Sequence, residues 1–189
     1  MPDPVLEEVK KGITVSDIAA VVVTTASKKY LIKTGTEANF RAAVDAGRET
    51  PLRKQNTILA MNKTEDILKG YDVDLTDVLM HPEVLALVDG GVATFGGTPV
   101  EFQSYTGPVA GQPVVRTPFD LDIYASNFDT DGDVVSYLQF TLKNCKGKPT
   151  EFTIRDGEFY TPKYTMESRP AGGESPITIA AVKTLPAVT

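Results

Sequence analysis

The segment that begins at Asn127 carries side chains of the type and spacing used by calcium-binding loops. Oxygen-bearing residues stand at Asn127, Asp129 and Asp131, and Gly132 supplies the residue at which such loops turn sharply. The pattern also requires a bidentate glutamate where this chain has Leu138, and a helix on each side. We therefore expect a hairpin turn here, with a weak adventitious ion as the alternative.

Other patterns that support chemistry are incomplete. The run from Gly91 to Thr98 approaches a phosphate-binding loop, but Gly97 replaces the required lysine. His81 is the only histidine and Cys145 the only cysteine, so a nucleophilic dyad would need these two side chains together with an orienting group. One His and one Cys cannot supply the four ligands of a structural zinc site. We expect no enzyme activity, no cofactor and no metal site.

Asp120 and Asp122 alternate with apolar residues on a predicted strand, so both carboxylates share one face. That face most often points to solvent, and the alternative is an acidic lining opposite a polyanion. The formal net charge of −6 makes the chain a poor candidate for gripping nucleic acid, because that affinity comes from neutralising phosphates. It leaves room for a protein that stands beside DNA without holding it.

The composition is that of an ordinary globular protein. The chain has 189 residues, of which 41% are hydrophobic and 23% charged, so we expect one domain with a sizeable core. A single cysteine excludes an internal disulfide and fits a reducing compartment. The N-terminal residues do not have the pattern of a signal peptide, and the best apolar run, residues 18–26, is too short to span a bilayer. We expect a soluble protein with no membrane partner.

The elements that position these residues are predicted to be mainly strands. Apolar residues at every second position predict a block of antiparallel strands between residues 118 and 182, separated by turns rich in Asp, Gly and Pro. Its runs are residues 119–125, 134–142, 152–154, 160–166 and 177–181. Earlier strands are expected at residues 18–25, 30–33, 57–66, 69–75, 92–95 and 100–105.

One helix is predicted at about residues 76–90, with Thr76 as its N-cap and paired glycines at its end. Pro82 lies inside this range, so the helix either begins near Pro82 or is broken there. The domain organisation that follows is an N-terminal arm (residues 1–17), a single domain (18–182) and a C-terminal tail (183–189) with little to bury.

Residues 34–56 contain few apolar residues, and these are mostly small. We expect a long loop, with at most one amphipathic helical turn around Phe40, made locally basic by Arg48, Arg53 and Lys54. Loops of this length are uncommon in a compact domain unless they are functional or disordered. The segment is therefore predicted to order against a partner, with a flexible surface insertion as the alternative.

Two stretches, together with the order of the elements, resemble the tail tube proteins of long-tailed bacteriophages and related tail-like particles. The first is residues 75–91 (LTDVLMHPEVLALVDGG), a helix between strands that ends in paired glycines. The second is residues 151–179 (EFTIRDGEFYTPKYTMESRPAGGESPITI), a β-hairpin followed by an Arg-Pro, Gly-rich turn and a last strand.

This resemblance implies an antiparallel β-sandwich or partly closed barrel with one flanking α-helix. It implies rings, usually hexamers, that stack into the tube through which DNA leaves the capsid. The partners would then be further copies of the chain, with a tape measure protein and genomic DNA in the lumen and no specific DNA binding. A sheath, a baseplate and a terminator protein are further candidates. The location would be the virion tail, assembled in the host bacterial cytoplasm.

The resemblance also gives roles to individual segments. The loop at residues 34–56, with Arg48, Arg53 and Lys54, matches the loop that contacts neighbouring rings, and the two termini are candidate arms. Asp120 and Asp122 are candidate lumen acids, because negative charge on a channel wall keeps DNA phosphates from sticking to it.

Two alternatives stay open. One is another ring protein of the same fold in a tail or head, such as a baseplate, tail terminator or decoration protein. The other is a β-sandwich module for ligand binding or adhesion. The absence of Trp, and the lack of a visible platform among the seven Tyr, make a carbohydrate-binding module less favoured.

Overall fold

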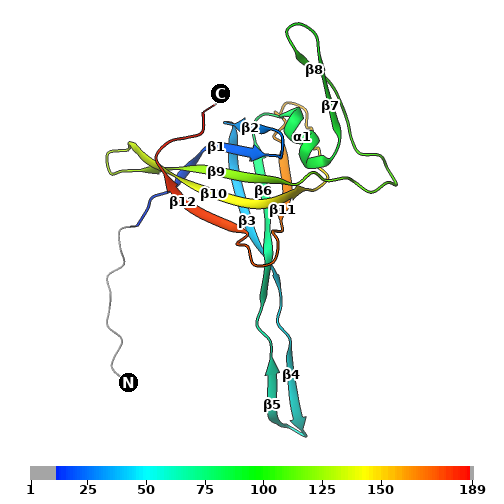
Figure 1. Ribbon diagram of the computed structural model, residues 1–189, viewed down its shortest axis with the longest axis vertical. Helices are drawn as coiled ribbons and strands as arrows, with labels where there is room; N and C mark the ends of the chain where they lie inside the picture. Colours follow the sequence, from blue (N-terminus) through cyan, green and yellow to red (C-terminus); the bar gives the residue numbers. More distant parts are fainter. Residues whose placement is uncertain (1–11, 188–189) are drawn as a thin grey trace.

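The computed structural model describes residues 12–187. In this part of the chain the fold is mainly β, with twelve strands and one short helix (Figure 1). Most of the predicted N-terminal arm, residues 1–11, lies outside the described residues, as do residues 188 and 189 of the predicted tail.

The strands predicted from alternation are present with one exception. The elements are β1 (Ser16–Thr24), β2 (Lys29–Ile32), β3 (Gly35–Asp45), β4 (Glu49–Lys54), β5 (Thr57–Lys63), β6 (Ile67–Asp77), α1 (Pro82–Asp89), β7 (Val92–Gly96), β8 (Glu101–Thr106), β9 (Phe119–Phe128), β10 (Val134–Gly147), β11 (Lys163–Ser168) and β12 (Ile177–Val182). The strand predicted at residues 152–154 is wrong. These residues alternate as a strand does, but they lie in an irregular loop between β10 and β11.

Eight strands form one antiparallel sheet in the order β2-β1-β9-β10-β11-β6-β3, with β12 also paired to β10. The long strand β10 pairs with β12 along residues 137–142 and with β11 along residues 145–147. The sheet therefore divides into two layers, and Figure 1 shows β1, β9, β10 and β12 crossing the direction of β3, β6 and β11. The sheet is antiparallel and ends at β2 and β3 without closing into a barrel, so the predicted mainly antiparallel β fold with one helix is confirmed.

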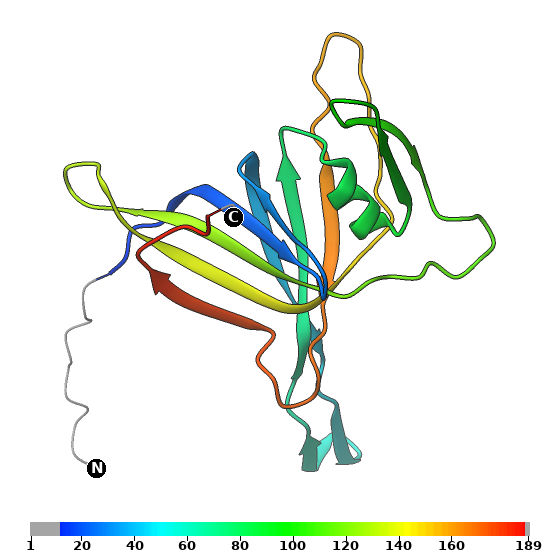
Figure 2. The same ribbon diagram turned by 45° about the horizontal axis from the view of Figure 1, so that its top comes forward.

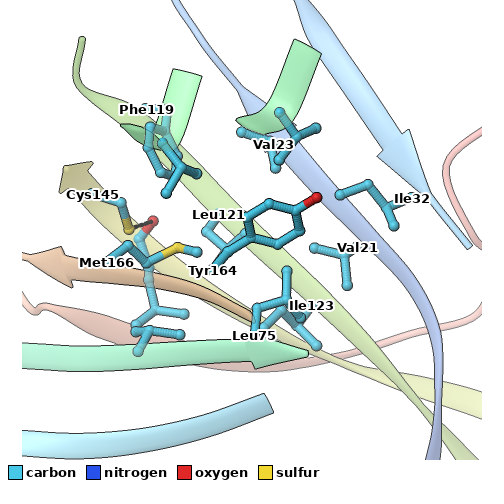
Figure 3. Packing of buried hydrophobic residues seen from close by; sticks show 14 of the residues in the cluster. Val21, Val23, Ile32, Leu75, Phe119, Leu121, Ile123, Cys145, Tyr164 and Met166 are labelled. Atoms are coloured by element: carbon cyan, nitrogen blue, oxygen red, sulfur yellow. Dashed lines mark hydrogen bonds between the residues drawn. The ribbon is translucent and has the colours of Figure 1, made fainter. Parts of the chain in front are cut away.

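The main core lies between the two layers. Figure 3 shows Tyr164 and Met166 of β11 facing Leu121 and Ile123 of β9, and these four side chains are at most 2% exposed. Each is separated from the next core residue of its strand by one residue that points the other way, as alternation predicts. The remaining buried residues of this cluster are Val21, Val23, Ile32, Val73, Leu75, Val84, Leu85, Val88, Phe119, Leu142 and Cys145.

The helix is shorter than predicted and begins at the proline. Thr76 is paired with Lys163 and Glu37 in the sheet, so the chain is still a strand where the N-cap was expected. Pro82 is the first residue of α1, where its missing N–H costs no hydrogen bond. The helix covers one end of the core, and a Cβ added to Gly147 of β10 would lie 2.0 Å from the Val88 carbonyl oxygen.

The loop predicted at residues 34–56 is wrong, because this segment forms β3 and β4. Ala38 and Phe40 of β3 pack against the core, while Asn39 between them is exposed. Pairing with β6 along the whole length of β3 supplies the stabilisation that few and small apolar residues do not. The helical turn expected around Phe40 is likewise part of this strand.

A second, smaller cluster lies on the outer face of the β1 and β9 layer. It contains Ala20, Val22 and Tyr124, with Leu185 of the C-terminal tail packed against them. The expectation that the tail buries little is therefore wrong for Leu185, which closes over this face. Pro186 follows it beside a hollow of about 370 Å³ next to β2.

Candidate assembly surfaces

The hairpin formed by β3 and β6 continues beyond the sheet as the β4–β5 arm (residues 46–66), which projects from the body in both views (Figures 1 and 2). Side chains hold the junction: the Gly47 N–H donates to Asp66 Oδ1 at 2.7 Å, and the Arg48 N–H donates to Thr64 Oγ1 at 2.7 Å. These bonds replace the ladder where the pairing of β3 with β6 ends. The arm is thus an ordered extension of the sheet.

Large apolar side chains on the β4–β5 arm are at least half exposed. Leu52 is 62% exposed, and Leu59 and Met61 of β5 are 60% and 51% exposed. Ile58 alternates with these two and is 50% exposed, so both faces of the arm carry apolar side chains. A two-stranded hairpin is at best marginally stable by itself in water. The arm therefore presents apolar surface that no other segment of the described chain buries.

The three basic residues predicted for this segment are distributed along the arm. Arg53 and Lys54 are exposed at the tip, at the end of β4, and Arg48 is exposed at the base. Within residues 12–187 no carboxylate lies within 4.0 Å of Arg53 or Lys54. The tip of the arm therefore combines unpaired positive charge with exposed apolar side chains.

A second projection, the β7–β8 arm (residues 92–106), leaves the body next to α1, away from the β4–β5 arm (Figure 1). Val92 and Val100 are 66% and 74% exposed. The rings of Phe95 and Phe102 meet edge to face with centroids 6.0 Å apart, which covers part of their own surface. This arm too carries apolar side chains that are not in the core of the described chain.

Asp89 at the end of α1 anchors the β7–β8 arm to the body. It is 6% exposed and accepts a hydrogen bond from the Tyr105 hydroxyl and one from the Thr150 N–H at 2.8 Å. Burial, and then the hydrogen bond to Asp89, raise the pKa of Tyr105 above its ordinary value. The Tyr105 hydroxyl therefore stays protonated, and remains a hydrogen-bond donor, throughout the physiological pH range. The buried Asp89 carboxylate thus joins α1, the β7–β8 arm and the loop that begins at Thr150.

The 150–160 loop lies on the same side of the body as α1 and the β7–β8 arm (Figure 2). Phe159 is 98% exposed and Ile154 81%, and Phe152, which stacks on Tyr160, is 50% exposed. A hollow of about 680 Å³ separates this loop from the outer face of β6 and β11 and is lined in part by Glu151. The loop is thus an exposed apolar surface beside a hollow.

The floor of this hollow is charged, and its carboxylate, Asp74, is paired with two cations. Asp74 lies 2.8 Å from an Arg41 guanidinium nitrogen and 3.2 Å from Lys163 Nζ, and it accepts a hydrogen bond from Thr165 Oγ1 at 2.9 Å. Burial acts to raise the pKa of Asp74, but the hydrogen bonds from Thr165 and Lys163 and the charges of Lys163 and Arg41 outweigh it, so the pKa is lowered. The carboxylate stays ionised and paired.

Asp120 and Asp122 share the outer face of β9, and both have partners within the chain. Asp120 Oδ1 accepts a hydrogen bond from the Asn144 N–H at 2.9 Å. Asp122 Oδ1 accepts hydrogen bonds from Thr141 Oγ1 at 2.5 Å and Gln139 Nε2 at 3.0 Å. The structure therefore places the two predicted lumen acids together, on a different part of the molecule from Arg53 and Lys54 at the arm tip.

His81 and Cys145 do not form a dyad, because each side chain has different partners. His81 Nε2 lies 3.1 Å from Thr34 Oγ1 and 3.4 Å from the buried Asp77 carboxylate. The Cys145 thiol is buried, with its Sγ 3.7 Å from the Leu142 carbonyl oxygen, and burial raises its pKa to about 12, which keeps it protonated. A protonated, enclosed thiol cannot act as a nucleophile.

The calcium-like segment is a hairpin turn, as predicted. Asp129 Oδ1 accepts hydrogen bonds from the N–H groups of Asp131 and Asp133 at 3.0 and 2.9 Å, so this carboxylate closes the turn between β9 and β10. No group of three His, Cys, Asp or Glu side chains suited to a metal ion occurs in residues 12–187. No helix within the same residues has both the length and the apolar character needed to cross a bilayer.

The apolar residues of the arm are the candidate functional residues that sequence reasoning missed. Ile58, Leu59 and Met61 belong to a strand that was predicted, but the run ILAM (residues 58–61) is apolar at consecutive positions instead of alternating. A strand of this kind needs cover on both faces. That signal, next to a basic tip, was present in the sequence.

Comparison with known proteins adds no relative to this description. No family model matches the chain, and no curated protein is similar enough to be counted as a relative.

Proposed function

We propose that this chain is a structural subunit that joins copies of itself into rings stacked as a hollow tube. The observation that carries the proposal is the placement of exposed apolar side chains on three segments that project from the body: the β4–β5 arm, the β7–β8 arm and the 150–160 loop. Soluble monomers rarely expose apolar patches beyond a few hundred Å², and larger ones mark sites of association. Assembly would bury these surfaces.

Unpaired sheet edges support the same proposal. Within residues 12–187, β2 and β3 end the main sheet and β12 pairs with β10 along one edge only. Open edges invite pairing with other chains unless they are protected. A contact between different edges of successive copies is heterologous, and heterologous contacts close into rings or continue as filaments.

The specific assignment to a bacteriophage tail tube, or to a related tail-like particle, is supported by the sequence resemblance at residues 75–91 and 151–179. In this proposal the lumen holds a tape measure protein and then DNA, which passes without being bound. The net charge of −6 per copy suits a wall from which phosphates are repelled. The protein then acts through assembly and has no catalytic role.

Negative-stain electron microscopy of the concentrated, purified protein tests this function. We expect rods of variable length with a central channel. The double variant Leu59→Asp/Met61→Asp should form no rods, because carboxylates cannot be buried in an apolar contact without a large penalty. A wild-type protein that stays monomeric at high concentration would contradict the proposal. Single closed rings without rods would favour a terminator or baseplate role instead.

A further inference from the structure

We infer that the tip of the β4–β5 arm (residues 52–59) of one copy binds the 150–160 loop of a second copy. This inference rests on the proposed function, because it identifies the two surfaces that meet when one ring stacks on the next. Four properties of the described residues support it: position, apolar character, charge and shape.

The two surfaces lie on opposite sides of the molecule along its long axis. Figures 1 and 2 both show the β4–β5 arm projecting from one end of the body and the 150–160 loop on the side of α1, at the other end. They cannot meet within one copy. A head-to-tail arrangement brings the arm of one copy to the loop of the next, and such a contact repeats without limit along an axis.

Both surfaces are apolar at their most exposed points. The tip presents Leu52 and Leu59, which are 62% and 60% exposed. The loop presents Ile154 and Phe159, which are 81% and 98% exposed. These side chains stand on extended segments and have few neighbours in their own chain to pack against. Contact between the tip and the loop would therefore bury apolar side chains of both surfaces.

The charges of the two surfaces are opposite. Arg53 and Lys54 give the tip positive charge, and no acid lies between residues 50 and 62. The loop contains three acids, Glu151, Asp156 and Glu158, against the single base Arg155. Arg155 lies 3.5 Å from Glu158, and within residues 12–187 no cation lies within 4.0 Å of Glu151 or Asp156.

The hollow beside the loop can receive long side chains. Its volume is about 680 Å³, which is within the range that suits a ligand or a peptide segment. Its lining contains three acids, and two of them are paired: Asp74 with Arg41 and Lys163, and Glu158 with Arg155. Lys148 also lines the hollow and is paired with Asp72 and Glu167. Within residues 12–187, Glu151 is therefore the acid of this lining that has no cation within 4.0 Å, and it is the group that a lysine or arginine from an arm tip would pair with.

The same features favour a second copy over a nucleic acid as the occupant of the tip. Phosphates would be attracted to Arg53 and Lys54, but they would leave the apolar side chains of both faces of the arm in water. A surface of this chain that combines acids with exposed aromatic and aliphatic groups satisfies both requirements at once.

A charge-exchange experiment tests the inference in the full chain. Arg53→Glu/Lys54→Glu reverses the tip, and Glu151→Lys/Asp156→Lys reverses the loop. We expect each pair to raise the concentration needed for rod formation at least tenfold, and the two pairs combined in one chain to restore it to within about threefold of wild type. The matched control, Asp131→Lys/Glu174→Lys, reverses two exposed acids that lie outside both surfaces and away from the edge strands β2 and β3, and it should change this concentration less than threefold.

Cross-linking supplies a readout that does not depend on rods. The variants Lys54→Cys and Glu158→Cys are mixed and treated with a short bismaleimide, and each is also treated alone. We expect a covalent dimer mainly in the mixture. Replacing Lys54→Cys by Lys28→Cys should abolish it.

The outcomes separate the two proposals. Rods of wild type with no rescue by charge exchange and no cross-link would overturn this contact and leave the proposed function standing. A specific cross-link without any rods would support the contact and count against the tube. Absence of both rods and cross-link would overturn both.

Discussion

The ring of Phe40 stacks on the ring of Phe140, with centroids 5.7 Å apart and an interplanar angle of 18°. Phe40 belongs to β3, the strand that continues toward the β4–β5 arm, and Phe140 belongs to β10, which is shared by both layers of the sheet. This contact therefore joins the middle of β3, within the body, to β10.

Removing the Phe40 ring should destabilise the unassembled protein. We expect Phe40→Ala to lower the free energy of unfolding by about 2–4 kcal/mol, because it leaves a space against Phe140 that the strands cannot close. Urea unfolding at low protein concentration, followed by circular dichroism, measures this. Leu52→Ala on the exposed arm is the control and should change stability by less than about 0.5 kcal/mol. Equal effects of the two substitutions would show that the stacked pair has no special role.

Removing the Tyr105 hydroxyl should loosen the β7–β8 arm. Tyr105→Phe deletes the hydrogen bond to the buried Asp89, and a hydrogen bond to a charged group contributes about 1.5–3 kcal/mol. We expect faster amide hydrogen exchange across residues 92–106, with little change in β9 and β10. The control is Tyr30→Phe, whose hydroxyl makes no hydrogen bond within the described chain. Unchanged exchange in Tyr105→Phe would mean that other contacts hold the arm.

The Cys145 thiol should be unreactive in the folded protein. With its pKa raised to about 12 by burial, about one thiol in 10,000 is ionised at pH 8, and the thiolate is the reactive form. We expect no labelling by iodoacetamide at pH 8 over hours, and rapid labelling after unfolding in urea. Fast labelling of the folded protein would contradict this prediction and would show that this part of β10 opens often enough to expose the thiol.

The paired carboxylates of the outer face should make stability depend on acidity. The hydrogen bond from Arg169 lowers the pKa of Asp72 below its ordinary value of 3.8, and the pKa of Asp74 is lowered as well. The unfolded chain then binds more protons than the folded chain below about pH 4, so stability rises with pH there. The contribution is present above about pH 4 and is lost as pH falls through the lowered values.

Unfolding in urea at pH 5 and pH 3 checks this sign. The variant Asp72→Asn/Asp74→Asn should lose less stability between the two pH values than wild type does. The control, Asp131→Asn/Glu174→Gln, changes two exposed acids that have no ion-pair partner in the described residues, and it should behave like wild type. A wild-type loss no larger than that of Asp72→Asn/Asp74→Asn would contradict the prediction.

The fold class was predictable because alternation is a local property. In β9, Phe119, Leu121 and Ile123 are separated by single polar residues, and the structure buries all three. The helix start was predictable only as one of two choices, because the sequence could not show that Thr76 is paired within the sheet. The segment at residues 34–56 was misjudged, because a strand with few apolar residues is recognisable only from the partner strand that stabilises it.

The sequence by itself determined the antiparallel strands whose apolar residues alternate, the turn at Asp129 and the single helix that ends at paired glycines, and it lacks a complete catalytic motif. Only the tertiary structure decided where exposed apolar side chains gather. Leu59 and Phe159 are ordinary residues of a strand and a loop in the sequence, and their exposure depends on whether any distant segment folds over them. In this chain the core closes between β9 and β11 without them, so they remain on projections at opposite ends of the molecule.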